Sequence, residues 1–190
     1  MNLLYDGSIG KKLWLEQIAN KYGDFKIAFS KKVNGEHVYY KHRSVIECSS
    51  DENLYYMFDI CNHRQILPYE IIIDLDDEKA IADVDKICNR LDGHKEEFIC
   101  YKTGSKGFHI HIIEKKLAII RNNYKNHSED FFKLIHNEIY KLLIQKQLKI
   151  FVDTQKGSNK TLIAFENVPH WKTGIKKIIY RKGIYNGRNN

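Results

Sequence analysis

The sequence lacks the features that mark membrane-spanning, secreted and disulfide-rich proteins. It has no apolar run near the roughly 20 residues that a transmembrane helix needs, and its amino terminus has no apolar core of a secretory signal. Its four cysteines form no C-x-x-C pair, which argues against a disulfide framework and against structural zinc. We therefore expect a soluble, cytoplasmic (intracellular) protein that contacts no membrane and holds no zinc.

The residues that are present predict a folded, basic protein. A hydrophobic content of 43%, with 12 Tyr and 9 Phe, can supply the core of one compact domain in 190 residues. The net charge of +7 favours a polyanionic partner, because basic side chains near phosphates release condensed counterions. We expect single-stranded nucleic acid to bind a basic cluster near the carboxyl end. The cluster comprises Lys172, Lys176, Lys177, Arg181 and Lys182.

Hydrophobic periodicity and turn residues predict a small α/β lobe over about residues 1–68. The dipeptide Asn34-Gly35 is a strong hairpin signal between two short strands. The expected elements are a helix over 8–22, strands over 25–30, 37–40 and 44–48, and a helix from Ser49 or Ser50 to Cys61.

A second lobe is predicted over about residues 69–182, followed by a mobile tail at 183–190. Its strands and helices are intermixed, so the fold class expected for the chain is α+β. The expected elements are strands over 70–75, 97–101, 108–113, 150–152, 160–165 and 176–180, and helices over 78–92 and 128–147.

The strand at 70–75 ends in a pair of acids, Asp74 and Asp76. Residues i and i+2 of a strand point to the same face, so these carboxylates project together while the isoleucines between them pack the other face. Such carboxylates repel each other unless a proton or cation lies between them, and hard oxygen ligands suit Mg²⁺ or Mn²⁺. The alternative is a solvated acidic turn that caps the next helix. A third acid, Asp153, follows the short apolar strand at 150–152.

A glycine-rich turn at 103–107 precedes the strand at 108–113. Glycine allows the backbone to approach a phosphate closely, and a hydroxyl and a lysine between two glycines supply a donor and a charge. His109 and His111 share one face of the strand, opposite an apolar face. The alternative is an ordinary hairpin with two surface histidines.

These segments resemble the motifs of the archaeo-eukaryotic primase superfamily, which includes primase small subunits and primase-polymerases. The resemblance runs from about Glu70 to Gly174. The matching segments are Ile73-Asp74-Leu75-Asp76, Thr103-Gly104-Ser105-Lys106-Gly107-Phe108-His109, Val152-Asp153 and Val168-Pro169-His170-Trp171-Lys172-Thr173-Gly174.

The resemblance implies a DNA primase or primase-polymerase that transfers nucleotides from nucleoside triphosphates onto a primer along a single-stranded DNA template. It implies an RRM-like antiparallel catalytic sheet in the second lobe. Asp74, Asp76 and Asp153 would be catalytic and would hold two ions, Mg²⁺ or Mn²⁺. The nucleotide would be bound by Thr103, Ser105, Lys106, His109, His170 and Lys172. A large subunit or helical accessory domain is an expected partner.

Several positions depart from the family pattern. Thr103 and Lys106 replace the usual serine and arginine, and lysine cannot form a bidentate fork. Ala164 stands where many members carry an arginine, so nucleotide affinity is expected to be weaker or to depend on Arg181 instead. Members also carry an arginine upstream of the first motif, for which Arg43 and Arg64 are both candidates. His111 matches no motif position and is expected behind the site.

Two other functions use the same residues. A metal-dependent nuclease would need the same acids, and a non-catalytic module could bind single-stranded nucleic acid on the same fold. The match of His170 and Lys172 to triphosphate-binding positions argues against a nuclease. The three intact acids argue against a module without catalysis, because clustered acids are costly without a cation.

Overall fold

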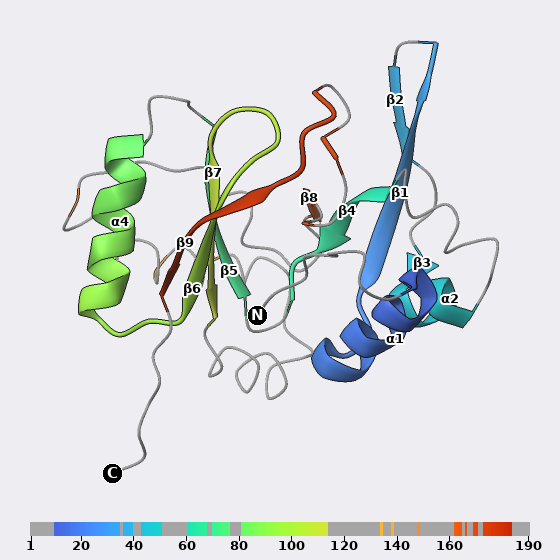
Figure 1. The fold of residues 1–190 in the computed structure, drawn as a ribbon, viewed down its shortest axis with the longest axis horizontal. Coiled ribbons are helices and arrows are strands. Elements are labelled where there is room, and N and C mark those ends of the chain that lie inside the picture. The colour runs from blue at the N-terminus through green and yellow to red at the C-terminus, as the bar shows by residue number, and fades with distance from the viewer. Residues whose placement is uncertain are drawn as a thin grey trace.

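The computed structural model describes residues 10–34, 36–39, 43–50, 61–67, 70–76, 81–113, 134, 138, 148, 162–164, 166, 169–170 and 173–183. These residues form two antiparallel sheets with a few helices, which confirms the α+β class. In Figure 1 the helix α4 (Ile81–Gly93), the second sheet and the first sheet follow one another from left to right. No helix among the described residues is both long and apolar enough to cross a membrane.

The first sheet combines strands from both ends of the chain. Its order is β2-β1-β4-β8, and β3 also pairs with β1. The two helices α1 (Lys11–Tyr22) and α2 (Val45–Ser50) lie together below β1 in Figure 1. The strands are β1 (Lys26–Val33), β2 (Glu36–Tyr39), β3 (Arg43–Ser44), β4 (Cys61–Gln65) and β8 (Leu162–Ala164).

Two predictions for this region are wrong. The expected strand at 44–48 is instead the beginning of α2, and Cys61 begins a strand where a helix end was expected. The reason lies in a capping box. Ser44 Oγ accepts a hydrogen bond from the Glu47 backbone N–H (3.0 Å), and Glu47 Oε2 accepts one from the Ser44 N–H (3.0 Å). This reciprocal cap begins the helix at Val45, before the expected serines.

The second sheet has the strand order β5-β7-β6-β9, with every neighbouring pair antiparallel. The predicted strands at 70–75 and 108–113 are confirmed residue for residue, and β9 extends beyond the predicted 176–180 to Gly183. Leu134, Glu138 and Leu148 are helical, while Asp153, Lys172 and residues 184–190 lie outside the described residues. The strands are β5 (Glu70–Leu75), β6 (Phe98–Lys102), β7 (Phe108–Ile113) and β9 (Ile178–Gly183).

The two faces of the second sheet have different roles because successive side chains alternate between them. One face packs against α4 and forms the main core, with the isoleucines expected there. The core includes Ile71, Ile73, Leu75, Phe98, Cys100, Phe108, Ile110 and Ile112 from the sheet, and Val84, Ile87, Cys88 and Leu91 from α4. The other face is turned toward the first sheet, where Ile72 packs with Ile66 and Ile163. The polar residues described next lie on this second face.

Candidate active site

Asp74 and His109 form a cross-strand pair. The register of β5 and β7 places them opposite each other, and His109 Nε2 lies 3.3 Å from Asp74 Oδ1. Both side chains are buried, whereas Asp76 at the end of β5 is exposed. The structure therefore places a histidine next to Asp74, one of the two acids predicted to share a face.

Burial decides the charge of His109. It lowers the pKa of the imidazole to about 3, the charge of Lys177 acts in the same direction, and the carboxylate of Asp74 opposes both. The imidazole is therefore neutral at pH 7. A neutral imidazole that directs Nε2–H toward Asp74 keeps a lone pair on Nδ1. Nδ1 is buried and has no hydrogen-bond partner among the described residues.

The glycine-rich turn is packed directly against the end of β5. Gly107 has a φ of 87°, and a β-carbon there would lie 1.9 Å from the carbonyl oxygen of Leu75. Only glycine fits both the conformation and the close approach. Thr103 closes the turn by donating its hydroxyl to the carbonyl of Lys106 (2.7 Å), so this hydroxyl does not face outward. Ser105 and Lys106 are exposed at the tip of the turn.

His170, Thr173 and Ile175 lie against the same turn. The Thr173 hydroxyl donates a hydrogen bond to the carbonyl of Gly104. A β-carbon at Gly104 would lie 1.8 Å from the Ile175 carbonyl oxygen and 2.9 Å from the β-carbon of His170. A tight turn shapes the segment that carries His170, because the Gly174 N–H donates to the His170 carbonyl (2.8 Å). The structure thus brings together the end of β5, the glycine-rich turn and His170.

A buried ionic network lies next to this site. The Arg64 guanidinium donates to both oxygens of Glu70 (2.8 Å each), to both oxygens of Glu166 (2.8 and 2.9 Å) and to the Gln65 carbonyl (3.0 Å). All five N–H groups of the arginine are therefore used. His111 Nδ1 lies 2.8 Å from Glu70 Oε1, which assigns the imidazole proton to Nδ1. The network joins β4, β5, β7 and Glu166, which lies two residues beyond the end of β8.

The charges in this network support one another. Burial would raise the pKa of Glu166, but the charges of Arg64 and Lys177 outweigh it and lower that pKa to about 2. The pKa of Glu70 is lowered in the same way, by Arg64 and His111 against burial. Burial lowers the pKa of His111. Both glutamates are therefore ionised at neutral pH and His111 is neutral.

Glu70, His111 and Glu166 are close enough to be considered as ligands of one metal ion. The guanidinium of Arg64 already occupies the space that the carboxylates enclose, and a cation there would have to displace five hydrogen bonds. This cluster is better explained as an internal ion pair network. The end of β5 suits a divalent cation better, because Asp74 and Asp76 offer hard oxygen ligands on one face beside a neutral histidine.

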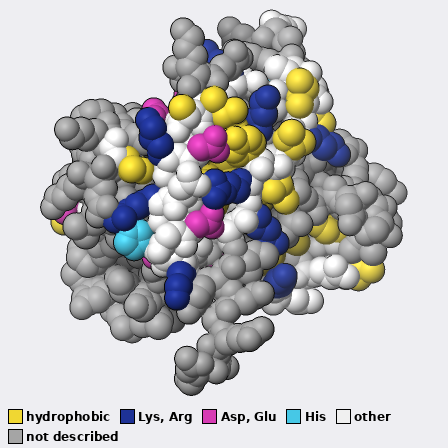
Figure 2. Space-filling model, turned by 60° about the vertical axis from the view of Figure 1, so that its left-hand side comes forward, with side chains coloured by type: hydrophobic (Ala, Val, Ile, Leu, Met, Phe, Trp, Pro, Cys, Tyr) yellow, Lys and Arg dark blue, Asp and Glu magenta, His cyan; other side chains and the backbone are white. Residues whose placement is uncertain are grey.

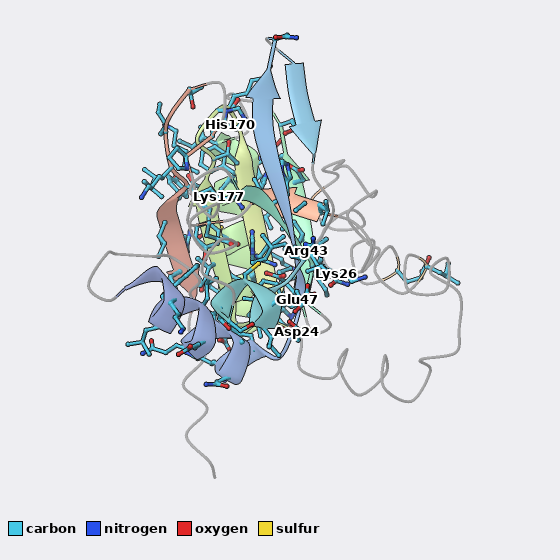
Figure 3. The ribbon with its side chains drawn as sticks, turned by 90° about the vertical axis from the view of Figure 1, so that its right-hand side faces the viewer. Asp24, Lys26, Arg43, Glu47, His170 and Lys177 are labelled. Atoms are coloured by element: carbon cyan, nitrogen blue, oxygen red, sulfur yellow. The ribbon has the colours of Figure 1, made fainter. Side chains whose placement is uncertain are left out.

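The structure distinguishes Arg43 from Arg64, the two candidate arginines upstream of the first motif. Arg64 lies in the network, but no N–H group remains for a phosphate. Arg43 pairs with Ile27 in the first sheet, and Figure 3 draws it beside Lys26 and far from His170. Arg181 lies on the opposite face of the second sheet, where it pairs with Asp92 of α4, so it does not take the place expected for it near Ala164.

The predicted basic cluster is smaller than expected. Lys177 is buried and Arg181 is half-buried, which leaves Lys176 and Lys182 as the exposed members among the described residues. Figure 2 shows Lys and Arg side chains spread among hydrophobic ones on the face that carries α4 and β9. His109 and His111 are also buried, which excludes the alternative of an ordinary hairpin with two surface histidines. Sequence reasoning missed Glu70, Glu166 and Lys177.

No family model, curated protein or solved structure matches this chain. The functional argument therefore rests on its own residues and their arrangement.

Proposed function

We propose that this protein is a template-directed nucleotidyltransferase of the archaeo-eukaryotic primase type. The observation that carries the proposal is the convergence of three segments that are far apart in the sequence. Asp74 and Asp76 lie at the end of β5, Gly107 packs on that end, and Gly104 packs on the segment that carries His170. Acids for metal ions and a turn for phosphates are thus adjacent, which polymerisation of nucleoside triphosphates requires.

The strand order supports an RRM-like form of the second sheet. Strand β7 lies between β5 and β6, and α4 connects β5 to β6 along the chain. An RRM places its first three strands in this way, with its first helix after the first strand. The polar face of this sheet would carry the reaction.

Each residue has a definite part in the proposed reaction. Asp74, Asp76 and Asp153 would hold two Mg²⁺ or Mn²⁺ ions, which activate the 3′-hydroxyl of the primer and neutralise the triphosphate. Asp74 is oriented by its contact with His109. The exposed Ser105 and Lys106, with the backbone of the glycine-rich turn, bind phosphate oxygens, while His170 and Lys172 approach from the other side. The products are an extended primer and pyrophosphate.

The template and the partner are part of the same proposal. Single-stranded DNA binds through exposed lysines, so its affinity falls steeply with salt. The 190-residue chain leaves little surface for a template, and a large subunit or helical accessory domain would supply more. The protein acts in DNA replication inside the cell.

Replacing His109 with alanine tests whether the glycine-rich turn and β7 form a nucleotide-binding site. We expect an apparent KM for nucleotide raised, or kcat lowered, by about ten- to a hundred-fold. The variant removes the Nε2–H that faces the Asp74 carboxylate, and a hydrogen bond to a charged group is worth about 1.5–3 kcal/mol. Binding of single strands should stay within about two-fold, since a neutral histidine adds little long-range field. Nucleotide titrations and strand-binding isotherms measure the two effects.

His94 provides the matched control, because it is an exposed histidine in the turn after α4. His94→Ala should change neither nucleotide dependence nor strand binding. If His109→Ala impairs strand binding and leaves nucleotide dependence as in the wild type, the polymerase assignment fails and a nuclease becomes the better account.

A further inference from the structure

Lys177 is a buried lysine whose ammonium has few contacts. Its side chain is only 3% exposed, and Nζ lies 4.0 Å from Glu166 Oε1 and 5.4 Å from the centre of the Tyr101 ring. Nζ makes no hydrogen bond to any described residue. An ammonium carries three N–H donors, and buried polar groups nearly always find partners. The part of the chain that the structure describes therefore leaves the donors of Lys177 unused.

The position of Lys177 links it to the candidate site. It follows the segment docked on the glycine-rich turn, and Figure 3 shows it on the same carboxyl-terminal segment as His170. Its charge is close enough to lower the pKa of His109, and the carboxylate of Asp74 acts in turn on Lys177. Lys177 thus lies beside Tyr101 of β6 and acts on the Asp74–His109 pair.

Glu166 does not depend on Lys177 for its hydrogen bonds. Both of its oxygens accept from Arg64, at 2.8 and 2.9 Å, so the carboxylate stays satisfied when the ammonium moves away. The ion pair at 4.0 Å is long and unsupported by a hydrogen bond. The charge of Glu166 therefore stabilises the ammonium of Lys177 beside the site, while the N–H donors of Lys177 stay available.

We propose that Lys177 is a phosphate-binding residue of this site. Its ammonium moves away from Glu166 and donates hydrogen bonds to the triphosphate group of the nucleotide. The ligand class is a polyphosphate, since phosphate oxygens accept from several donors at once and match the positive charge. The inference rests on the proposed function only for the identity of the natural ligand. Binding of a polyphosphate at Lys177 can be measured without any turnover.

The test measures binding of inorganic tripolyphosphate to the full chain by calorimetry, with and without Mg²⁺. Lys177→Met should weaken binding by about ten- to a hundred-fold, the range for a lost hydrogen bond to a charged group. Lys86→Met is the control, because it removes the same charge from an exposed lysine of α4 that lies outside the basic cluster. It should change binding by less than about two-fold. Equal affinity in Lys177→Met and wild type would overturn the proposal, as would an equal loss in both variants.

A second measurement uses the wild-type protein, so it does not depend on the folding of a variant. Pyridoxal 5′-phosphate forms an imine with a lysine amine by loss of water, and borohydride then reduces the imine to a stable adduct. Mass spectrometry should find Lys177 labelled in preference to Lys176, and tripolyphosphate should protect it. The inference would be contradicted if Lys177 were labelled to the same extent with and without tripolyphosphate. Tripolyphosphate binding at Lys177 without nucleotidyl transfer would instead refute the proposed reaction and leave this inference standing.

Discussion

Asp74→Asn is expected to lower nucleotidyl transfer by about 10³-fold or more, since a metal ion contributes several kcal/mol to the transition state and each 1.36 kcal/mol is tenfold in rate. Asparagine keeps the shape of the side chain and an oxygen that can face His109, which lies 3.3 Å away. It loses the negative charge that holds a cation. Rates of primer extension, measured at equal protein concentration, give the size of the effect.

Two further variants test whether the loss of nucleotidyl transfer is specific to the acids at the end of β5. Asp76→Asn should cause a similar loss, because both acids lie on one face of the strand end. Asp83→Asn should cause none, because Asp83 is a half-exposed residue of α4 that pairs with Lys86 on the surface. All three variants should melt cooperatively near the wild-type temperature. Extension by Asp74→Asn at the wild-type rate would rule out the metal assignment.

Arg64→Met should destabilise the fold more than any surface substitution. It leaves the carboxylates of Glu70 and Glu166, both fully buried, without the guanidinium that bonds to all four of their oxygens. Breaking a buried ion pair in this way costs about 3–5 kcal/mol. The free energy of unfolding by urea measures the loss. Arg43→Met, in strand β3 of the same sheet, should cost less than about 1 kcal/mol.

The pH dependence of stability tests whether the lost ion pairs cause the destabilisation of Arg64→Met. The native pKa values of Glu70 and Glu166 are below their unfolded values, so the network adds stability above about pH 4.5. That stability is lost as the pH falls toward about 2, the native pKa of Glu166. Without Arg64 both native pKa values rise towards or above their unfolded values, so the loss of stability on acidification should be smaller than in the wild type. Parallel pH profiles for Arg64→Met and wild type would contradict this account.

The parts of the fold that follow from local sequence were predictable. Strands 70–75 and 108–113 are confirmed because each has a complete apolar face, and the same alternation placed Asp74 and His109 on the polar face. Their pairing across the sheet did not follow, since register depends on the turn and on tertiary packing. Helix α2 was missed even though Ser44 and Glu47 form a capping box that is visible in the sequence.

The buried network could not have been predicted from local patterns. Arg64 and Glu166 are 102 residues apart, and nothing near either residue indicates the other. Charged residues are mostly exposed, so Lys177 was assigned to a surface cluster. The structure buries it because the second sheet faces the first, and the polar face of β5 and β7 becomes an interior. Long-range packing of this kind changes both the charge and the role of the residues involved.

Primer extension by the wild-type protein tests the central claim most directly. The protein is incubated with a primed single-stranded template, Mn²⁺ and labelled nucleoside triphosphates, so that the primer supplies the 3′-hydroxyl and no partner is needed for initiation. The account predicts template-dependent lengthening of the primer with release of pyrophosphate. A shortened template, or an unextended primer bound by the protein, would contradict it.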